Sequence, residues 1–150
     1  MRIAVLSLMF PAWTETFVQR EVRALRDRGH EVRVFTFRPP IGPVVEAPAG
    51  VGIERWSGSA VKEFQPDVLY GQLGWEAQKA TAATSEALKV PYALRLWSGL
   101  DSLGLPAECR AWYGGLDSPL CRGIVVEDAF MTEWAITMLR PGVPVHAVPN

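Results

Sequence analysis

Apolar and polar residues alternate along this chain in blocks whose period changes between that of a strand and that of a helix. Residues 2–8 (RIAVLSL) are nearly all large or β-branched apolar residues, which is typical of a strand buried on both faces of a parallel sheet. In residues 14–28 apolar positions recur at helical spacing between charged ones, which predicts an amphipathic helix. Gly29 can adopt the left-handed conformation that ends such a helix. Residues 31–37 (EVRVFTF) return to the alternation of a strand. The beginning of the chain therefore predicts one βαβ unit.

The same succession of strands and helices continues after a loop. Residues 38–52 hold four prolines and three glycines, which predicts irregular structure at the surface. Beyond this loop we expect strands at residues 53–56, 67–73, 91–97, 123–126 and 143–148, and helices at residues 58–64, 75–89, 107–113 and 129–139. This alternation predicts an α/β fold with a doubly wound, mostly parallel Rossmann-like sheet and helices on both faces. The length of 150 residues fits a single domain of this kind.

The composition narrows the classes of function. A net charge of −1 lacks the basic excess of a nucleic-acid binder, so no nucleic-acid partner is expected. The apolar stretch at residues 2–10 is too short for a signal peptide or a membrane span, which favours the cytoplasm. Cys109 and Cys121 lack the spacing of a redox pair or a zinc site, so both are expected to be reduced. His30 and His146 also lack metal-ligand spacing, and neither a metal nor a cofactor is expected.

The predicted topology indicates where a ligand would bind. In an open α/β sheet the ligand crevice lies beyond the carboxyl ends of the strands, because loops and helix amino termini converge there. The candidates lie at or just after the carboxyl ends of the first, fourth, fifth and sixth predicted strands. They are Pro11, Thr14, Glu15, Thr16, Gly71, Gln72, Trp97, Ser98, Asp101 and Glu127. Hydroxyl and carboxylate groups among them suit a polyhydroxylated ligand, and no catalytic residue can be chosen from the sequence.

Some of these candidates also have a structural interpretation. Thr14 can cap the first helix through its hydroxyl, and Glu15 in the first turn suits the positive end of the helix dipole. The same carboxylate disfavours a diphosphate ligand at this helix start, because the two negative charges would repel. Asp101 is as well explained by a capping role in its loop as by a hydrogen bond to a sugar hydroxyl.

Two further pairs of charged residues have alternative interpretations. Glu127 and Asp128 precede a predicted helix, where carboxylates serve more often as caps than as ligand-binding groups. Arg20 and Glu21 are spaced so that one could face the cleft and the other solvent. Charged residues on an amphipathic helix usually form its wet face, and we favour that interpretation for both.

Several stretches resemble a known family when they are taken together. The run RIAVLSLMFPAWTETFVQREVRALRDRGHEVRVFTF resembles the amino-terminal opening of family 4 glycosyltransferases, especially bacterial polysaccharide enzymes, in which a strand, FP and a short spacer precede (S/T)ETFV. PDVLYGQLG, VPYALRLWSGLD and GIVVEDAFMTEW follow in the family's order. The final VPVHAVPN is similar to the strand that ends the first domain of these enzymes.

The resemblance implies a retaining glycosyltransferase of the GT-B fold, of hexosyltransferase type. Such enzymes have two Rossmann-like domains that face each other across a cleft. The first mainly holds the acceptor, a saccharide or a lipid-linked saccharide, and the second holds the nucleotide-sugar donor. Residues 1–150 would then be the acceptor-side domain, inactive without the donor-binding domain, and a peripheral contact with a membrane is left open. Trp97 stands where the family usually has a histidine, so its indole could stack on a sugar but could not supply imidazole chemistry.

Two other functions compete with this one. The chain could be a stand-alone saccharide-binding or regulatory module that pairs with a separate donor-domain chain. A dinucleotide-dependent oxidoreductase is suggested by the fold class alone, and the FPAWTE turn lacks the glycines that a dinucleotide requires. If the crevice faces a partner domain, we expect an exposed aromatic patch near Trp13, Trp75 and Trp97.

Overall fold

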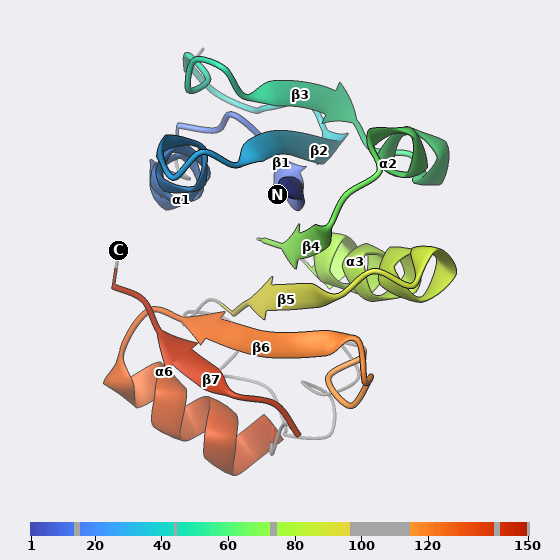
Figure 1. Cartoon of the computed structure of the whole chain (residues 1–150). Coiled ribbons are helices and arrows are strands. Elements are labelled where there is room, and N and C mark those ends of the chain that lie inside the picture. Colours follow the sequence, from blue (N-terminus) through green and yellow to red (C-terminus); the bar gives the residue numbers. More distant parts are fainter. Residues whose placement is uncertain (14–15, 44, 73–74, 97–114, 140–141, 150) are drawn as a thin grey trace.

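The structure is a computed structural model that describes residues 1–13, 16–43, 45–72, 75–96, 115–139 and 142–149. The described residues form one sheet of seven parallel strands in the order β3-β2-β1-β4-β5-β6-β7 (Figure 1). The strands are β1 (Arg2–Met9), β2 (Glu31–Arg38), β3 (Gly52–Arg55), β4 (Val68–Gly71), β5 (Tyr92–Arg95), β6 (Cys121–Val126) and β7 (Val145–Ala147). The helices are α1 (Thr16–Asp27), α2 (Gly58–Phe64), α3 (Trp75–Leu88) and α6 (Ala129–Trp134), which runs on into the π-helix η1 (Ala135–Leu139). The predicted Rossmann-like, doubly wound α/β fold is confirmed.

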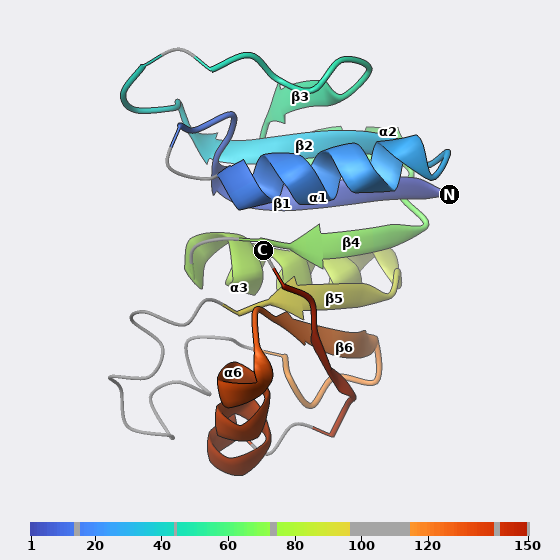
Figure 2. The same ribbon diagram turned by 90° about the vertical axis from the view of Figure 1, so that its left-hand side faces the viewer.

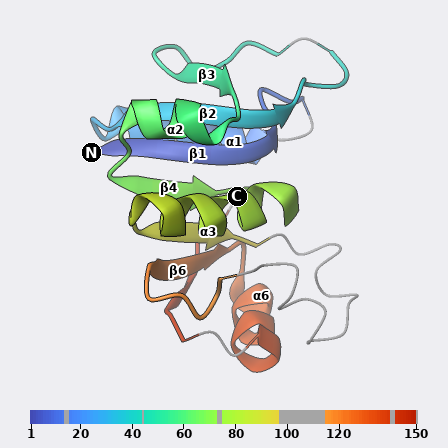
Figure 3. The same ribbon diagram turned by 90° about the vertical axis from the view of Figure 1, so that its right-hand side faces the viewer.

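Helices cover both faces of the sheet because successive side chains of each strand point to opposite sides. Ile3 and Val5 of β1 belong to one apolar cluster with Val18 and Val22 of α1. The alternate side chains of β1 join a second cluster, to which α2, α3 and α6 contribute. Figure 2 shows α1 in front of β1 and β2, and Figure 3 shows α2 and α3 on the opposite face.

Local capping explains where several helices begin and end. The Ser57 hydroxyl accepts a hydrogen bond of 3.1 Å from the backbone N–H of Ala60 at the start of α2. The Asp128 carboxylate accepts one of 2.7 Å from the N–H of Met131 at the start of α6, which confirms the capping interpretation for this residue. After α1, Gly29 adopts a φ of 80°, the left-handed conformation that favours glycine.

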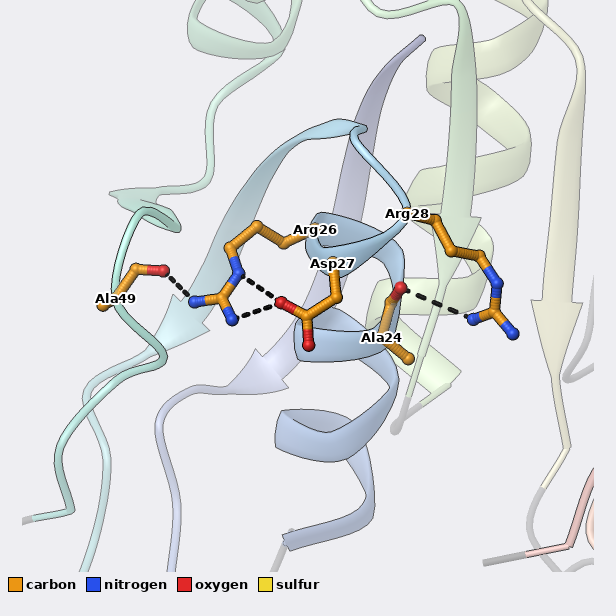
Figure 4. A network of polar contacts seen from close by, with 5 residues as sticks. All are labelled: Ala24, Arg26, Asp27, Arg28 and Ala49. Atoms are coloured by element: carbon orange, nitrogen blue, oxygen red, sulfur yellow. Dashed lines mark hydrogen bonds and ion pairs between the residues drawn. The ribbon is translucent and has the colours of Figure 1, made fainter.

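The loop between β2 and β3 is irregular, as its prolines and glycines predict, but it is fastened to α1. Arg26 forms a hydrogen bond to the carbonyl of Ala49 in this loop, and its Nε also lies 2.9 Å from the Asp27 carboxylate (Figure 4). Arg28 instead donates to the carbonyl of Ala24 on its own helix, at 3.4 Å. The part of the loop that leads into β3 is therefore held against the last turn of α1.

Element bounds differ from the predictions mainly at the ends. β4 and β5 are shorter than the predicted strands at 67–73 and 91–97. The helix predicted at 129–139 is α-helical only as far as Trp134, where it becomes a π-helix. The helix predicted at 107–113 lies outside the described residues. Among the described helices, none has the length and apolar content needed to cross a bilayer.

Candidate functional site

The strand order has its switch point between β1 and β4. The chain leaves β1 toward β2 on one side and leaves β4 toward β5 on the other, so the connections diverge and open a crevice at the carboxyl ends. Leu6 of β1 pairs with Gly71 of β4, and the backbone N–H of Gln72 donates to the Leu6 carbonyl at 2.8 Å. Gln72 is therefore held at the edge where the crevice is expected.

The turn after β1 is anchored by two buried residues. Phe10, which precedes the cis bond to Pro11, and Ala12 are almost fully buried. Gln19 of α1 donates from its side-chain nitrogen to the Ala12 carbonyl at 3.2 Å. Trp13, one residue further on, is 54% exposed. The turn therefore has a buried base and presents an indole at the carboxyl end of the sheet.

Gly71 has a packing reason to be glycine. A Cβ on this residue would lie 2.7 Å from the Leu94 side chain and 2.8 Å from the Thr81 hydroxyl oxygen. These contacts are too short for real carbon atoms, so α3 and β5 approach β4 more closely than any larger residue allows. Gly71 shapes this edge of the sheet through its lack of a side chain.

A buried polar network lies on the α1 face beside the switch point. The Glu21 carboxylate of α1 accepts hydrogen bonds from the Tyr70 hydroxyl at 2.9 Å and from the Gln72 side-chain amide. Its other oxygen lies 2.8 Å from a guanidinium nitrogen of Arg95 in β5. The Glu21 side chain is 18% exposed and that of Arg95 is fully buried. Two hydrogen-bond donors and one buried cation therefore stabilise a carboxylate that is largely withdrawn from water.

Arg95 also joins this network to the end of the chain. Its guanidinium donates to the carbonyl of Val148 at 3.0 Å. Its own backbone carbonyl accepts a hydrogen bond of 2.7 Å from the side chain of Gln78 on α3, across the sheet. One arginine thus connects helices on both faces with the segment that follows β7.

The network sets the protonation of Tyr70. Burial raises the pKa of this phenol well above its usual value, and the negative charge of Glu21 raises it further. Tyr70 is therefore a permanent donor at neutral pH. The Gln72 amide donates to the same carboxylate, while its side-chain oxygen is buried and accepts no hydrogen bond within the described part of the chain.

An exposed ion pair lies at the rim of the same edge. Arg38 at the end of β2 donates to Glu76 in the first turn of α3 at 2.8 Å, and each side chain is about half exposed. Arg38 pairs in register with Met9 of β1. The ion pair thus links the elements on either side of the carboxyl end of β1.

The structure brings four of the predicted site residues to the carboxyl ends of β1 and β4. Pro11 and Thr16 flank the first turn, Gly71 ends β4 and Gln72 follows it. Glu127 is half-buried at the end of β6, two strands further along the sheet, next to the capping residue Asp128. The other five, Thr14, Glu15, Trp97, Ser98 and Asp101, lie outside the described residues.

Sequence reasoning missed the buried network. The wet-face interpretation fits Arg20, which is exposed, but it is wrong for Glu21. Arg95 was not selected, although a charged residue inside the apolar run PYALRLW signals a buried partner. Tyr70 in VLYG gave a weaker signal of the same kind, since a buried phenol usually has a hydrogen-bond partner.

An apolar groove of about 330 Å³ lies on the α1 face, away from the carboxyl ends of β1 and β4. It runs between α1 and Val148, over Val68, Ala93 and Val125. Its walls are mostly aliphatic, and the polar atoms of Glu21 at its border are engaged in the buried network. Such a surface offers a sugar few hydrogen bonds, so we do not assign the groove to a saccharide.

Among the described residues, potential metal ligands are dispersed. Within the ranges described, no three His, Cys, Asp or Glu side chains are grouped to hold an ion. Cys121 has a buried thiol whose pKa is raised by burial, while Cys109 lies outside those ranges.

When the sequence is compared with models of known protein families none matches, and no curated protein matches it significantly. The function must therefore be inferred from the residues themselves.

Proposed function

We propose that residues 1–150 form the acceptor-side domain of a retaining glycosyltransferase, which transfers a sugar from a nucleotide-sugar donor to a saccharide or lipid-linked acceptor. The observation that carries the proposal is that stretches resembling the family meet at one edge of the sheet. The family-like stretch FPAWTETFV directly follows β1, and PDVLYGQLG contains β4, the neighbouring parallel strand. Both stretches therefore lead to the crevice at the switch point. VPYALRLW contains β5, the next strand in the sheet.

The chemistry at this edge suits a neutral polyol better than an anion. Glu21 brings a negative charge beside the switch point, and its only cationic contact described in the network, Arg95, is buried and committed to it. Gln72 is fully buried, so its side chain shapes this edge of the sheet from beneath and is not a free acceptor for a ligand. Its amide nitrogen donates to Glu21, which holds the residue after β4 in a set position before a ligand arrives.

Transfer requires donor and acceptor to be held together, because orientation supplies much of the rate enhancement of such reactions. We propose that the donor is held by a second domain outside residues 1–150. The acceptor-side domain alone would then bind a saccharide without catalysing transfer. The cytoplasm, where nucleotide sugars are made, is the compartment that this proposal favours.

Ligand binding and transfer assays on the 150-residue chain test this proposal. We expect binding of a neutral glycoside, no tight binding of UDP-glucose or GDP-mannose, and no transfer product from any of these mixtures. Sugar transfer by the isolated chain would refute the half-enzyme proposal. Tight binding of NAD in the same calorimeter would favour an oxidoreductase instead, although the turn at residues 10–13 has no glycine to accommodate a diphosphate.

A further inference from the structure

Trp13 combines exposure with a fixed position. The residue is 54% exposed, although indoles are among the most hydrophobic side chains and usually bury more of their surface. It lies between Ala12, which is buried, and the start of α1. A large aromatic surface is therefore presented to solvent beside the candidate crevice rather than left on a free chain end.

Gly42 supports the indole from the loop after β2. A Cβ on Gly42 would collide with Nε1 of Trp13 and lie 2.5 Å from its Cδ1, so the glycine backbone lies directly against the ring. Gly42 also has a φ of +99°, a conformation that other residues rarely adopt. Two independent features therefore require glycine at this position, and one of them is the contact with Trp13.

The loop that carries Gly42 is fixed at its other end as well. Arg26 binds the Ala49 carbonyl and the Asp27 carboxylate, which holds the loop against α1 (Figure 4). The indole thus rests on a loop that is itself fastened to the domain. A ligand that stacks on Trp13 would lose little of its binding energy to the ordering of the protein.

Polar groups of both kinds lie at the same edge of the sheet. Arg38, whose register partner is Met9 of β1, forms an ion pair with Glu76 that is about half exposed on each side. The guanidinium offers donors and the carboxylate offers acceptors, and the pair has no net charge. This combination suits hydroxyl groups, each of which donates one hydrogen bond and accepts others.

We propose that Trp13, seated on Gly42, is a stacking platform for a neutral sugar ring of the acceptor, at the edge of the sheet that also carries the Arg38–Glu76 ion pair. The inference rests on the proposed function, since it assigns a subsite to the same acceptor. The apolar C–H face of a pyranose matches the exposed indole. A phosphate-bearing ligand is disfavoured, because Arg38 at this edge is already paired with Glu76 at 2.8 Å.

Fluorine NMR of the chain labelled with fluorotryptophan tests this subsite. The chain has six tryptophans, and Trp13→Phe identifies the Trp13 signal by its loss. Methyl glycosides of glucose, galactose, mannose and N-acetylglucosamine are titrated into the millimolar range, with uridine as a planar control ligand. We expect at least one glycoside to shift the Trp13 signal in a saturable way, and to do so more strongly than uridine.

Two glycine variants provide a matched pair. Gly42→Ala places a methyl group against the indole, whereas Gly50→Ala adds one in the same loop, also at positive φ, with its nearest contact 3.5 Å away on Arg26. We expect Gly42→Ala to weaken glycoside binding about fivefold, the size of one aromatic stacking contact, and Gly50→Ala to leave it within about twofold.

The outcomes separate the subsite from the wider proposal. The same titrations are followed by amide NMR on an isotope-labelled sample. If a glycoside shifts the backbone amide signal of Gln72 there but not the Trp13 fluorine signal, the subsite is wrong and the acceptor-side function stands. If no glycoside shifts either signal, both are contradicted. A stronger response to uridine than to every glycoside would also overturn the subsite, because the platform would then favour a planar base.

Discussion

The carboxylate of Glu21 and the guanidinium of Arg95 lie 2.8 Å apart, on a helix and a strand that are separated by 74 positions of sequence (95 − 21). Both side chains are held in place, because Arg95 is fully buried and Glu21 accepts hydrogen bonds from Tyr70 and Gln72. The pair connects α1 to β5 across β4, the strand that Gln72 follows. It thereby fixes the geometry of the candidate crevice.

We predict that breaking this pair destabilises the domain strongly. Arg95→Met should lower the free energy of unfolding by about 3 kcal/mol, because it leaves the largely buried carboxylate without its counter-ion. The double variant Glu21→Gln/Arg95→Met should recover part of that loss, since neither charge then remains. Urea unfolding of the single and double variants measures the coupling.

Arg38→Met is the control for this prediction. It breaks an ion pair of the same 2.8 Å distance whose partners are about half exposed. Its cost should be below about 1 kcal/mol, because solvent screens the charges. Equal losses for Arg38→Met and Arg95→Met would show that burial does not distinguish the two pairs.

Because the pKa of Tyr70 is raised in the folded protein, we predict that the domain loses stability at alkaline pH. Its pKa in the folded protein is raised, first by burial and then by Glu21, whereas an unfolded tyrosine titrates near pH 10. The unfolded state therefore releases its proton first, so this stabilisation is complete below about pH 10 and is lost as pH rises toward the folded pKa.

Tyr70→Phe should reduce this alkaline loss while costing roughly 1–2 kcal/mol at neutral pH for the missing hydrogen bond to a carboxylate. Unfolding midpoints at neutral pH and at about pH 11 measure both effects. Tyr92, whose pKa burial also raises, keeps part of the alkaline dependence in the variant. An unchanged pH slope in Tyr70→Phe would contradict the assignment to Tyr70.

Gly71 is predicted to resist substitution for steric reasons. Gly71→Ala should cost about 1–3 kcal/mol, because its Cβ would collide with Leu94 and Thr81. Gly58→Ala is the control, since a Cβ there meets nothing within 4 Å and alanine favours the helix that begins at this residue. Thermal unfolding compares the two. A neutral Gly71→Ala would mean that α3 and β5 can move apart freely.

Asp128 is predicted to act through its cap alone. Asp128→Ala should lower stability by about 1 kcal/mol, because the N–H of Met131 loses its acceptor. Asp128→Asn keeps an acceptor oxygen and should remain within a few tenths of a kcal/mol of the original. Chemical denaturation distinguishes them, and a large loss in Asp128→Asn would indicate a role for the charge.

The pattern of apolar residues was sufficient to predict the fold. The period-two and period-3.6 blocks predict β1, α1 and β2 to within a few residues, and Gly58–Phe64 is a helix over the range expected for it. The ends of β4 and β5 were not predicted, because strand length depends on hydrogen bonds to neighbouring strands that are distant in sequence. The composition of the sequence did not indicate the π-helix after Trp134.

The candidate site was predictable only in part. Topology correctly indicated that Pro11, Thr16, Gly71 and Gln72 lie at the carboxyl ends of β1 and β4. The role of Glu21 could not be predicted from α1 alone, since its position on an amphipathic helix is also typical of a solvated charge. Only the three-dimensional structure brings Arg95 to it, and with Arg95 the link to Val148.

The most direct test of the central proposal is chemical-shift mapping of the isotope-labelled chain during titration with neutral methyl glycosides. We expect the shifted amides to gather at the carboxyl ends of β1 and β4, around Ala12, Thr16, Gly71 and Gln72. Amides at the opposite edge, such as those of Glu31 and Asp67, should not move. Shifts that gather at that opposite edge, or no shift with any glycoside, would contradict an acceptor site at the switch point.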